Sequence, residues 1–582
     1  MHRSILPKIL QAAIITTSWV AGGGAWSQAL PPAGQVGRDP MQAAPINKEG
    51  NPITAPAILS ASTQSTSAVS VTVSGFTFVG NANVSTEELQ RVVASSLNQK
   101  LDFAGLDKVA DSISNYYRSK GYTVARAYLP AQQSANGVIQ IAIIEGRYGS
   151  VNIKNGSAVS VERLRLTITN NLCSVSDGKD CIGKTIQDKG LERAILLLKD
   201  LPGLTVTANL KPGQAIGTSE LDVETKITKN TAYSLGFDNY GSPSTGITRL
   251  NASVDLNNLG AGGDQLSLGI ATTNTTDTKT GSASYSLPVG YDGQRVGIAY
   301  SRSQYRLGAG FSATLSHGTS NALSAFTSYP LIRSVNQSLY VRASAEVRSG
   351  INSVDLVSAS YRTNANVGRI GINGDNVDSF GGGGYTVYGL TVSQGFVGTN
   401  DAADSSATGA HSAGRFGKVA YNIARQQTLE GPVTLYTALN GQAGNKNLDG
   451  SEQTGLGGPS STRGYGGEAG GSTGASGTVE LRYTTPIQIG SSLDNITYAT
   501  FWDRGWVQYY QSPIVIGSVN TRSLSSYGLT FTVQSQARVP TPTSVGYFMR
   551  AMLGVHSMTA AQQSAVDTTS RGKLWIQGGL TF

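Results

Sequence analysis

The stretch SLYVRASAEVR, from Ser338 to Arg348, alternates between apolar and polar side chains along its whole length. Leucine, valine and alanine occupy the odd-numbered positions, and serine, tyrosine, arginine and glutamate occupy the even ones. A period of two is typical of a β-strand with one apolar face and one polar face. The C-terminal part of the chain is predicted to be all-β, because the same pattern returns between residues 231 and 582 in RLNASVDL, RVGIAY, VTLYTAL and TVELRY.

Alternating strands occur in soluble sandwiches and propellers as well as in membrane barrels. Three features favour the barrel: the segment follows an export signal, it shows no blade repeat, and its last strand ends on an aromatic residue. That strand, KLWIQGGLTF, ends at Phe582, which resembles the C-terminal assembly signal of bacterial outer-membrane barrels. Roughly 350 residues, at about 20 for each strand with its connection, predict about 16 antiparallel strands around an aqueous lumen. The apolar face of the last strand holds Leu574, Ile576, Gly578 and Leu580.

The N-terminus is typical of an export signal. Basic residues precede the apolar stretch Ile9–Val20, and Ala25–Ser27 fits a small-residue cleavage site. A membrane anchor is the alternative, but the apolar run is too short to cross a bilayer. We therefore predict a signal peptide over residues 1–27. Because proline recurs in the next stretch, residues 28–70 are predicted to be an extended linker.

Residues 71–148 and 149–228 share a β-α-α-β-β order of predicted elements, which makes them an internal repeat. In the first copy, VSVTVSGFTFVG predicts a strand, and Ser85 with Glu88 forms a capping box that starts a helix. The second helix of that copy is expected to end at Gly121. Two small α+β domains are therefore expected ahead of the barrel.

Cys173 and Cys181 are the two cysteines of the chain. After export they would meet an oxidising compartment, where a disulfide over a short loop is expected; two unpaired buried thiols are the alternative. Together with four scattered histidines they offer no ligand spacing for a metal, so no metal site is expected. Charged residues make up 14% of the chain and its net charge of +8 is dispersed, which argues against nucleic acid as a partner.

The glycine-rich stretch GGPSSTRGYGGEAGGSTG, from Gly457 to Gly474, contains the pattern G-x-G-x-x-A of a dinucleotide-binding turn. Such a turn requires a buried parallel strand before it and a helix after it. Here the flanking segments VTLYTALNGQ and TVELRY both predict strands, so the stretch is expected to be a long loop between two strands. The chain carries no P-loop, H-E-x-x-H or G-x-S-x-G motif, and we expect neither an enzyme nor a cofactor.

Two α+β repeats ahead of a C-terminal barrel resemble the TpsB transporters of two-partner secretion, which include the haemolysin activator proteins and the filamentous haemagglutinin transporter. The repeats correspond to the family's two POTRA domains, and the resemblance covers nearly the whole mature chain. The motifs that carry it are Gly121-Tyr122, Leu129-Pro130 and Glu145-Gly146-Arg147 in the first repeat, LERAILLLKDLPGLTVTANLKPG (Leu191 to Gly213) in the second, and FDNYGSPSTG (Phe237 to Gly246) with NNLGAGGDQLSL (Asn257 to Leu268) in the barrel.

The resemblance implies that the glycine-rich stretch is the family's sixth extracellular loop, folded back into the lumen. Arg463-Gly464-Tyr465 matches the loop motif, with Thr462 at its usual valine position. The arginine is expected to meet the acid of an F-x-D-x-G strand motif, here Phe501, Asp503 and Gly505. Alternation places these three on one face, so Asp503 is expected in the lumen; alternatively, Arg463 and Asp503 are separately solvated. In a hydrated lumen the pair would contribute on the order of 1 kcal/mol, and more if partly desolvated.

The resemblance further implies an outer-membrane pore, with its POTRA domains in the periplasm, that recognises and translocates one secreted β-helical TpsA protein of haemolysin or adhesin type. Partner segments are expected to add as strands to a POTRA sheet edge near TVARAYLP or LTVTANLKPG. Outer-membrane lipid, the barrel assembly machinery and periplasmic chaperones are the other expected partners. The alternative is an assembly factor of the same superfamily; a porin or passive adhesin would not need two POTRA domains. Several relatives plug the pore with an N-terminal helix, but no helix-length amphipathic run precedes residue 71 here.

Overall fold

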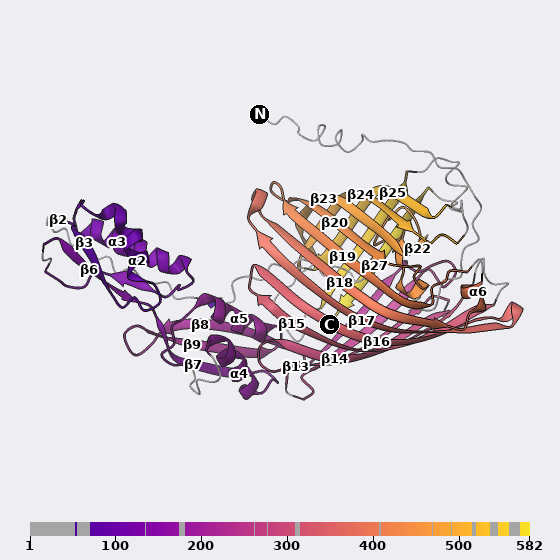
Figure 1. Ribbon diagram of the computed structural model, residues 1–582, viewed down its shortest axis with the longest axis horizontal. Helices are drawn as coiled ribbons and strands as arrows, with labels where there is room; N and C mark the ends of the chain where they lie inside the picture. The colour runs from indigo at the N-terminus through magenta and orange to yellow at the C-terminus, as the bar shows by residue number, and fades with distance from the viewer. Residues whose placement is uncertain are drawn as a thin grey trace, which may run out of the picture.

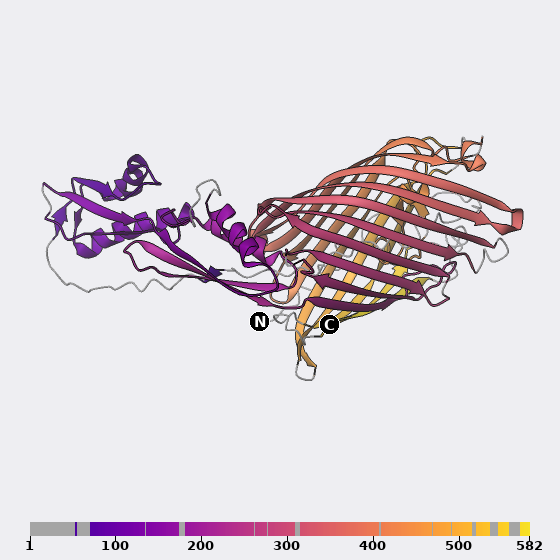
Figure 2. The same ribbon diagram turned by 90° about the horizontal axis from the view of Figure 1, so that it is seen from below.

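Two small α+β domains extend from one end of a large β-barrel (Figures 1 and 2). The predicted signal peptide, most of the predicted linker and the place of an N-terminal plug lie outside the described residues. In the described part of the chain, no helix is both long and apolar enough to cross a membrane. The computed structural model describes residues 53–54, 70–133, 136–173, 181–260, 262–275, 277–308, 315–406, 409–467, 469–489, 492–514, 519–535, 545–557 and 571–582.

The first domain packs two helices against a three-stranded sheet of order β3-β6-β5. The predicted capping bond is present, since Ser85 Oγ accepts the backbone N–H of Glu88 at 3.2 Å. Leu89, Ile113 and Ile141 are fully buried between the helices and the sheet, as the apolar helix stripes require. The elements are β2 (Val71–Thr72), β3 (Gly75–Val79), α2 (Thr86–Val93), η1 (Ala94–Ser96), β4 (Lys100–Leu101), α3 (Phe103–Ser119), β5 (Arg126–Tyr128) and β6 (Val138–Ile144).

Glu145 and Gly146 form the connection between the two domains. Glu145 is 5% exposed and accepts the backbone N–H of Asn83 at 2.7 Å and the hydroxyl of Tyr117 at 3.0 Å. Burial, together with this bond to the carboxylate, raises the pKa of Tyr117. Gly146 has φ +75°, and a Cβ there would lie 2.4 Å from Val124 Cγ2, so only glycine fits. The family-like motif thus fixes the path of the chain from one domain to the next.

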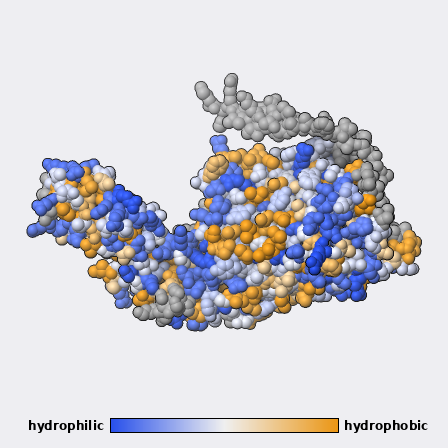
Figure 3. Space-filling view, in the orientation of Figure 1, coloured by the Kyte–Doolittle hydropathy of each residue, from blue (hydrophilic) through white to orange (hydrophobic). Residues whose placement is uncertain are grey.

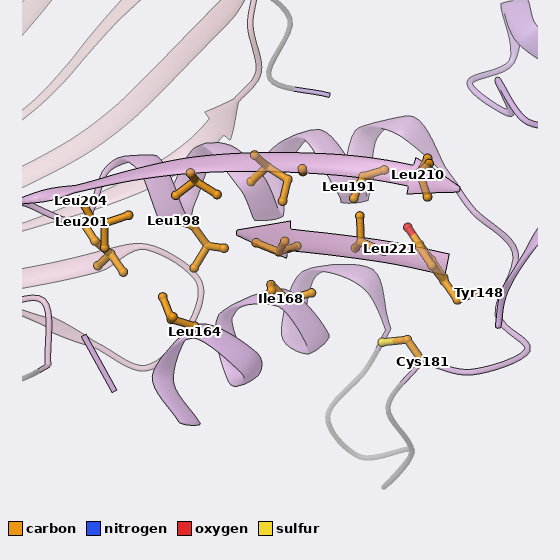
Figure 4. Packing of buried hydrophobic residues seen from close by; sticks show 14 of the residues in the cluster. Tyr148, Leu164, Ile168, Cys181, Leu191, Leu198, Leu201, Leu204, Leu210 and Leu221 are labelled. Carbon is orange, nitrogen blue, oxygen red and sulfur yellow. The ribbon is translucent and has the colours of Figure 1, made fainter. Parts of the chain in front are cut away.

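The second domain repeats the β-α-α-β-β order and buries an apolar core between its helices and its sheet (Figure 4). Its first strand begins at Arg147, before the predicted start at Gly149, because Tyr148 packs into this core with 1% exposure. A two-residue strand from the predicted linker, β1 (Ile53–Thr54), lies parallel to β8 at the sheet edge. The sheet order is β1-β8-β9-β7, and the elements are β7 (Arg147–Gly156), α4 (Val161–Leu172), α5 (Asp188–Lys199), β8 (Leu204–Pro212) and β9 (Thr218–Ile227).

Cys173 and Cys181 are joined by a disulfide, with their Cα atoms 5.6 Å apart. Cys173 directly follows α4, and Cys181 is buried in the core of the second domain (Figure 4). The bridge therefore ties the C-terminal end of α4 to that core.

Sixteen antiparallel strands of the described residues close into a barrel, which confirms the predicted fold class. The strands pair in chain order, and β27 pairs with β10 to close the ring. The strands are markedly tilted relative to the long direction of the barrel (Figure 2). The strands are β10 (Thr231–Asp238), β11 (Arg249–Asn257), β12 (Gln265–Thr273), β13 (Thr278–Val289), β14 (Gln294–Arg306), β15 (Ser316–Arg333), β16 (Gln337–Val354), β17 (Ala359–Asp378), β18 (Gly384–Thr399), β19 (Gly414–Thr428), β20 (Val433–Gly444), β23 (Thr473–Ile489), β24 (Ser492–Gln508), β25 (Thr521–Ser535), β26 (Gly546–His556) and β27 (Gly572–Thr581). Short helices in the connections are η4 (Asp355–Val357), η5 (Phe380–Gly382) and α6 (Ala402–Ser405).

The barrel strands present their apolar face outward. On β16, Val347 is 60% exposed whereas its neighbour Arg348 is 7% exposed. Ile270 and Leu529 also face outward, and apolar residues gather over the barrel flank (Figure 3). An apolar exterior with polar side chains inside is the pattern of a barrel that spans a membrane.

The C-terminal strand completes the barrel. Leu574 points outward and is 54% exposed, whereas Trp575 points inward and is buried. The backbone N–H of Phe582 donates to the carbonyl of Tyr233 at 2.9 Å, and the N–H of Tyr233 donates to the carbonyl of Phe582 at 3.3 Å. The terminal aromatic residue therefore pairs with the start of β10, at the seam where the ring closes.

The second domain docks on the barrel through its helices. Arg193 on α5 pairs with Asp292 at 2.9 Å, and Asp200 accepts two bonds from Arg333, at 2.7 and 2.9 Å. These barrel residues lie at or beside the turns β13–β14 and β15–β16, which are at the same end of the barrel. Connections at the other end, including the one between β20 and β23, face away from the two α+β domains.

Candidate functional site in the barrel lumen

The glycine-rich loop joins β20 to β23 and folds into the barrel. It contains η6 (Gly450–Glu452) and a small antiparallel pair, β21 (Thr454–Leu456) with β22 (Ala469–Gly471). Thr462, Arg463 and Tyr465 are at most 6% exposed, so the tip of the loop is buried against the wall. The described part of this stretch has neither the parallel strand nor the helix of a dinucleotide site.

Arg463 and Asp503 are in direct contact. The guanidinium donates from Nε to Asp503 Oδ2 at 2.9 Å and from Nη2 to Oδ1 at 2.6 Å, which is the paired geometry that favours arginine. The backbone N–H of Arg463 donates to the same carboxylate at 3.0 Å. Asp503 has no exposed surface and also accepts hydroxyl bonds from Thr478 at 2.6 Å and Ser526 at 3.2 Å.

A second carboxylate, Glu480, completes the environment of the loop arginine. Arg463 Nη1 donates to Glu480 Oε1, and Arg482 donates from Nε to Oε2 at 2.7 Å. Glu480 is 6% exposed and comes from β23, whereas Asp503 comes from β24. Two arginines and two carboxylates therefore meet at this place, which we call the arginine contact: Arg463, Glu480, Arg482 and Asp503.

Aromatic and small residues enclose the arginine contact. The guanidinium carbon of Arg463 lies 3.5 Å from the centre of the Phe501 ring, a cation–π arrangement. Trp575 Nε1 donates to the backbone carbonyl of Arg463 at 2.7 Å. A Cβ at Gly505 would come within 2.6 Å of Leu456 Cδ1, so the glycine of the strand motif lets the loop approach the wall. Phe501, Asp503 and Gly505 thus act on the same loop from one face of β24.

Tyr465, two residues after Arg463, also attaches the loop to the wall. Its hydroxyl donates to the carbonyl of Ser525 at 3.2 Å, and its ring stacks on His556 with 5.2 Å between ring centres. A Cβ at Gly464, just before it, would come within 2.9 Å of backbone atoms on β26. Glycine is therefore required where the loop backbone crosses this strand. Leu456, Tyr465, Val507 and Leu524 form a small apolar cluster beside it.

Burial changes the energetics expected from the sequence. A pair in a hydrated lumen would contribute about 1 kcal/mol, but Asp503 is fully buried and its lone pairs are occupied by hydrogen bonds. Removing one member of such a buried pair leaves an uncompensated charge and costs roughly 3–5 kcal/mol. Loss of either partner is therefore expected to release the loop tip from the wall.

Several residues of this site were not predicted from the sequence. Glu480 and Thr478 could have been found, because TVELRY alternates and both fall on the polar face that enters the lumen. Alternation also puts Trp575 on the lumen face, but nothing in the sequence places Trp575 or His556 beside the loop, since they come from β27 and the end of β26. Only the closure of the barrel brings those two strands to Arg463 and Tyr465.

Family models match most of the chain. Residues 217–520 match the model described as haemolysin secretion/activation protein ShlB/FhaC/HecB, and residues 71–146 match the POTRA domain of ShlB type. The chain belongs to this family. It is an outer-membrane β-barrel transporter of two-partner secretion, with its POTRA region in the periplasm, and it translocates a secreted TpsA protein. The loop end of the barrel therefore faces the cell exterior.

Known proteins of this family resemble the chain along most of its length. The heme/hemopexin transporter protein HuxB of Haemophilus influenzae (strain 86-028NP) is 27% identical over 444 residues, covering 74% of this chain and 75% of HuxB. The outer membrane transporter CdiB of Dickeya dadantii (strain 3937) is 27% identical over 383 residues, covering 64% and 65%.

Solved structures share the fold. CdiB from Escherichia coli matches with a TM-score of 0.68 at 21% identity, over 90% of this chain and 93% of that one. CdiB from Acinetobacter baumannii matches with a TM-score of 0.58 at 17% identity, over 99% and 96%. Both likenesses concern the arrangement of the POTRA domains and the barrel.

Proposed function

We propose that the lumen loop is the movable closure of the translocation path, and that the arginine contact holds it closed. The observation that carries this is the buried pair of Arg463 with Asp503, which attaches the loop tip to β24 inside the lumen. An unfolded partner needs that space, so the loop tip has to leave the wall, or shift along it, during transport. Side-chain hydrogen bonds and ion pairs can break and form again, so this contact is suited to a reversible step. Folding of the β-helical partner outside the cell would supply the driving force.

A reversible covalent lock tests this closure. Leu456 on the loop and Gly505 on β24 face each other, since a Cβ at Gly505 would lie 2.6 Å from Leu456 Cδ1. The sulfur of a cysteine at 456 takes about the place of Leu456 Cγ, so the variant L456C/G505C can form a disulfide. We expect the oxidised variant to stop secretion and a reductant to restore it. Each single-cysteine variant and the wild-type chain, which keeps its own disulfide, serve as controls. Secretion by the fully oxidised double variant would contradict a moving loop tip.

The partner enters, in this proposal, by adding a strand to a POTRA sheet edge. Among the described residues, β5 pairs with β6 on one side and has no strand on its other side. The corresponding edge of β8 is covered at Ala208 and Asn209 by β1. Unpaired backbone groups at a sheet edge are a template for an extended peptide. We therefore place first contact at β5, with β8 engaged once Ile53 and Thr54 are displaced.

Site-specific cross-linking can separate these edges. A photoreactive side chain at Tyr128 on β5 or at Thr207 on β8 would be combined with a stalled partner. The expected result is cross-linking at Tyr128 early and at Thr207 later. Cross-links confined to barrel positions would exclude strand addition at either POTRA edge.

The remaining partners concern biogenesis. We propose that periplasmic chaperones carry the unfolded chain and that the barrel assembly machinery inserts it into outer-membrane lipid. The support is the alternation of β27, its outward Leu574, and the aromatic end at Phe582. Replacing Phe582 with serine is expected to lower the amount of folded barrel in the outer membrane without changing transport per folded molecule. Heat-modifiable migration on gels measures the folded fraction.

The translocated protein is expected to be a single large secreted β-helical protein of the TpsA class. HuxB is described as a heme/hemopexin transporter protein and CdiB as an outer membrane transporter, and each is a relative with its own cargo. Co-expression of this chain with a candidate TpsA protein, followed by detection of that protein outside the cell, tests the pairing. Secretion in a strain that lacks this chain would contradict it.

A further inference from the structure

The lumen loop touches a second part of the wall, through Glu452. This residue ends η6 and has no exposed surface. Its carboxylate meets three cations from three strands: Arg348 Nη1 at 3.1 Å, Arg369 Nη2 at 3.4 Å and Lys418 Nζ at 2.8 Å. We call this place the glutamate contact; it consists of Glu452, Arg348, Arg369 and Lys418, with Glu346 beside them.

The glutamate contact is a docking place for the loop. The backbone of Glu452 takes part, since its carbonyl oxygen accepts hydrogen bonds from Lys418 Nζ at 2.8 Å and from Gln442 Nε2 at 2.9 Å. Just before it, Leu448 of the loop is buried among apolar side chains of the inner wall. The wall residues in that cluster are Ala365, Val367, Val397 and Phe416.

The wall side of this contact carries more positive than negative charge. Glu346 pairs with Arg348 and, at 3.2 Å, with Arg369. Of the four residues of the glutamate contact and Glu346, all in the described part of the chain, the wall supplies three cations and one carboxylate, and the loop supplies the other carboxylate. Arg348 and Lys418 are almost completely buried while the loop is docked, and in that state the carboxylate of Glu452 supplies a counter-charge that buried cations require.

We propose that Arg348, Arg369 and Lys418 form a carboxylate-binding site on the lumen wall, which Glu452 fills in the closed pore and acidic side chains of the passing polypeptide fill when the loop withdraws. This rests on the proposed movement of the loop. Exchange of one carboxylate for another keeps the cations compensated throughout transport. Glu452 is thus an internal substitute for the partner's Asp and Glu residues, and the loop is attached at two parts of the wall.

Ion selectivity of the purified full chain in planar bilayers tests the site without a partner. In a KCl gradient, E452Q is expected to raise the chloride-to-potassium permeability ratio about twofold or more, because it removes the carboxylate that screens the cations. D449N is the matched control, since it makes the same charge change in the same loop. Within the described residues, the Asp449 carboxylate accepts its hydrogen bonds from Ser451 inside η6.

A probe of the proposed ligand chemistry completes the test. A short oligoglutamate peptide is expected to block the current of E452Q at a concentration roughly tenfold lower than it blocks the wild type, and oligolysine is not. The variant R348Q/R369Q/E452Q should lose the block, and R348Q/R369Q alone should shift selectivity toward potassium. Heat-modifiable migration on gels confirms that each barrel is folded.

Equal permeability ratios for E452Q and D449N would overturn the proposal, as would block by oligoglutamate that persists without Arg348 and Arg369. If E452Q does not fold, the potassium shift of R348Q/R369Q decides the same question. Either negative result leaves the cysteine lock of the loop tip unaffected. The binding site and the moving closure can therefore fail separately.

Discussion

The lumen loop meets the barrel wall at two places of opposite chemistry. At the arginine contact, a cation of the loop enters a wall that supplies Asp503 and Glu480. At the glutamate contact, an anion of the loop enters a wall that supplies Arg348, Arg369 and Lys418. At the first, the loop cation meets two wall carboxylates and lies against an aromatic ring, whereas at the second the loop anion meets three wall cations. The difference separates a contact built to hold the loop from one built to exchange its ligand.

Removing the loop cation should produce the largest effect. R463A leaves two buried carboxylates, of which Asp503 keeps no cation, and costs the docked loop roughly 3–5 kcal/mol. About 3 kcal/mol corresponds to a factor of roughly 100 in the docking equilibrium. We expect the loop to become open to protease in outer-membrane preparations and the basal conductance to rise, because the proposed closure is released. R504A is the matched control, because Arg504 follows Asp503 on β24 and points outward. Similar proteolysis in R463A and R504A would contradict the holding role.

Comparing the two wall carboxylates sharpens the picture of the arginine contact. D503N should be more damaging than E480Q, because Asp503 accepts the backbone N–H and two side-chain bonds of Arg463, whereas Glu480 accepts one. An amide cannot accept all of these bonds, and the loss is expected to be roughly 2–4 kcal/mol for D503N against about 1–2 kcal/mol for E480Q. Protease accessibility of the loop and secreted partner measure both variants. Equal losses of loop docking in the two variants would mean that docking depends on the total charge of the site and not on the hydrogen-bond geometry at Asp503.

The arginine contact could largely be predicted from the sequence, and the glutamate contact could not. Arg463 and Asp503 lie in motifs of a known family, and strand alternation places Asp503 in the lumen. Glu452 lies in a loop without period or motif, so nothing local indicates which wall it meets. Its cations come from β16, β17 and β19, and only the register of the closed barrel brings them together.

The barrel fold could also be predicted, because the pattern that indicates it lies within each strand. Period-two alternation is a property of each strand, so it predicted an all-β region and an outward Val347 without any knowledge of pairing, and the length of the segment predicted about sixteen strands. Because Asp503 is buried, the arginine contact falls under the desolvated case of the expectation from the sequence, for which more than about 1 kcal/mol applies. Whether water reaches Asp503 is decided by Phe501, Trp575 and the loop backbone, which come from separate parts of the chain.

Neutralising the loop anion should affect docking less than removing the loop cation. E452Q keeps its backbone bonds to Lys418 and Gln442, and Glu346 still pairs with Arg348 and Arg369. We expect a loss of about 1–2 kcal/mol in loop docking and a small rise in basal conductance. Protease titration of the loop, run beside R463A, ranks the two contacts. A larger effect for E452Q than for R463A would reverse the assignment of holding and exchange.

The smallest effect is expected where the loop touches the wall without charge. In G505A the new methyl group would lie 2.6 Å from Leu456 Cδ1, at the far end of a flexible side chain. The side chain can turn away, so overpacking should cost only about 1 kcal/mol. L456V shortens the opposing side chain and should restore docking in the double variant G505A/L456V, measured by the same protease titration. If the loop of the double variant is cleaved as readily as that of G505A, Gly505 matters for the strand backbone of β24 and not for the approach of the loop.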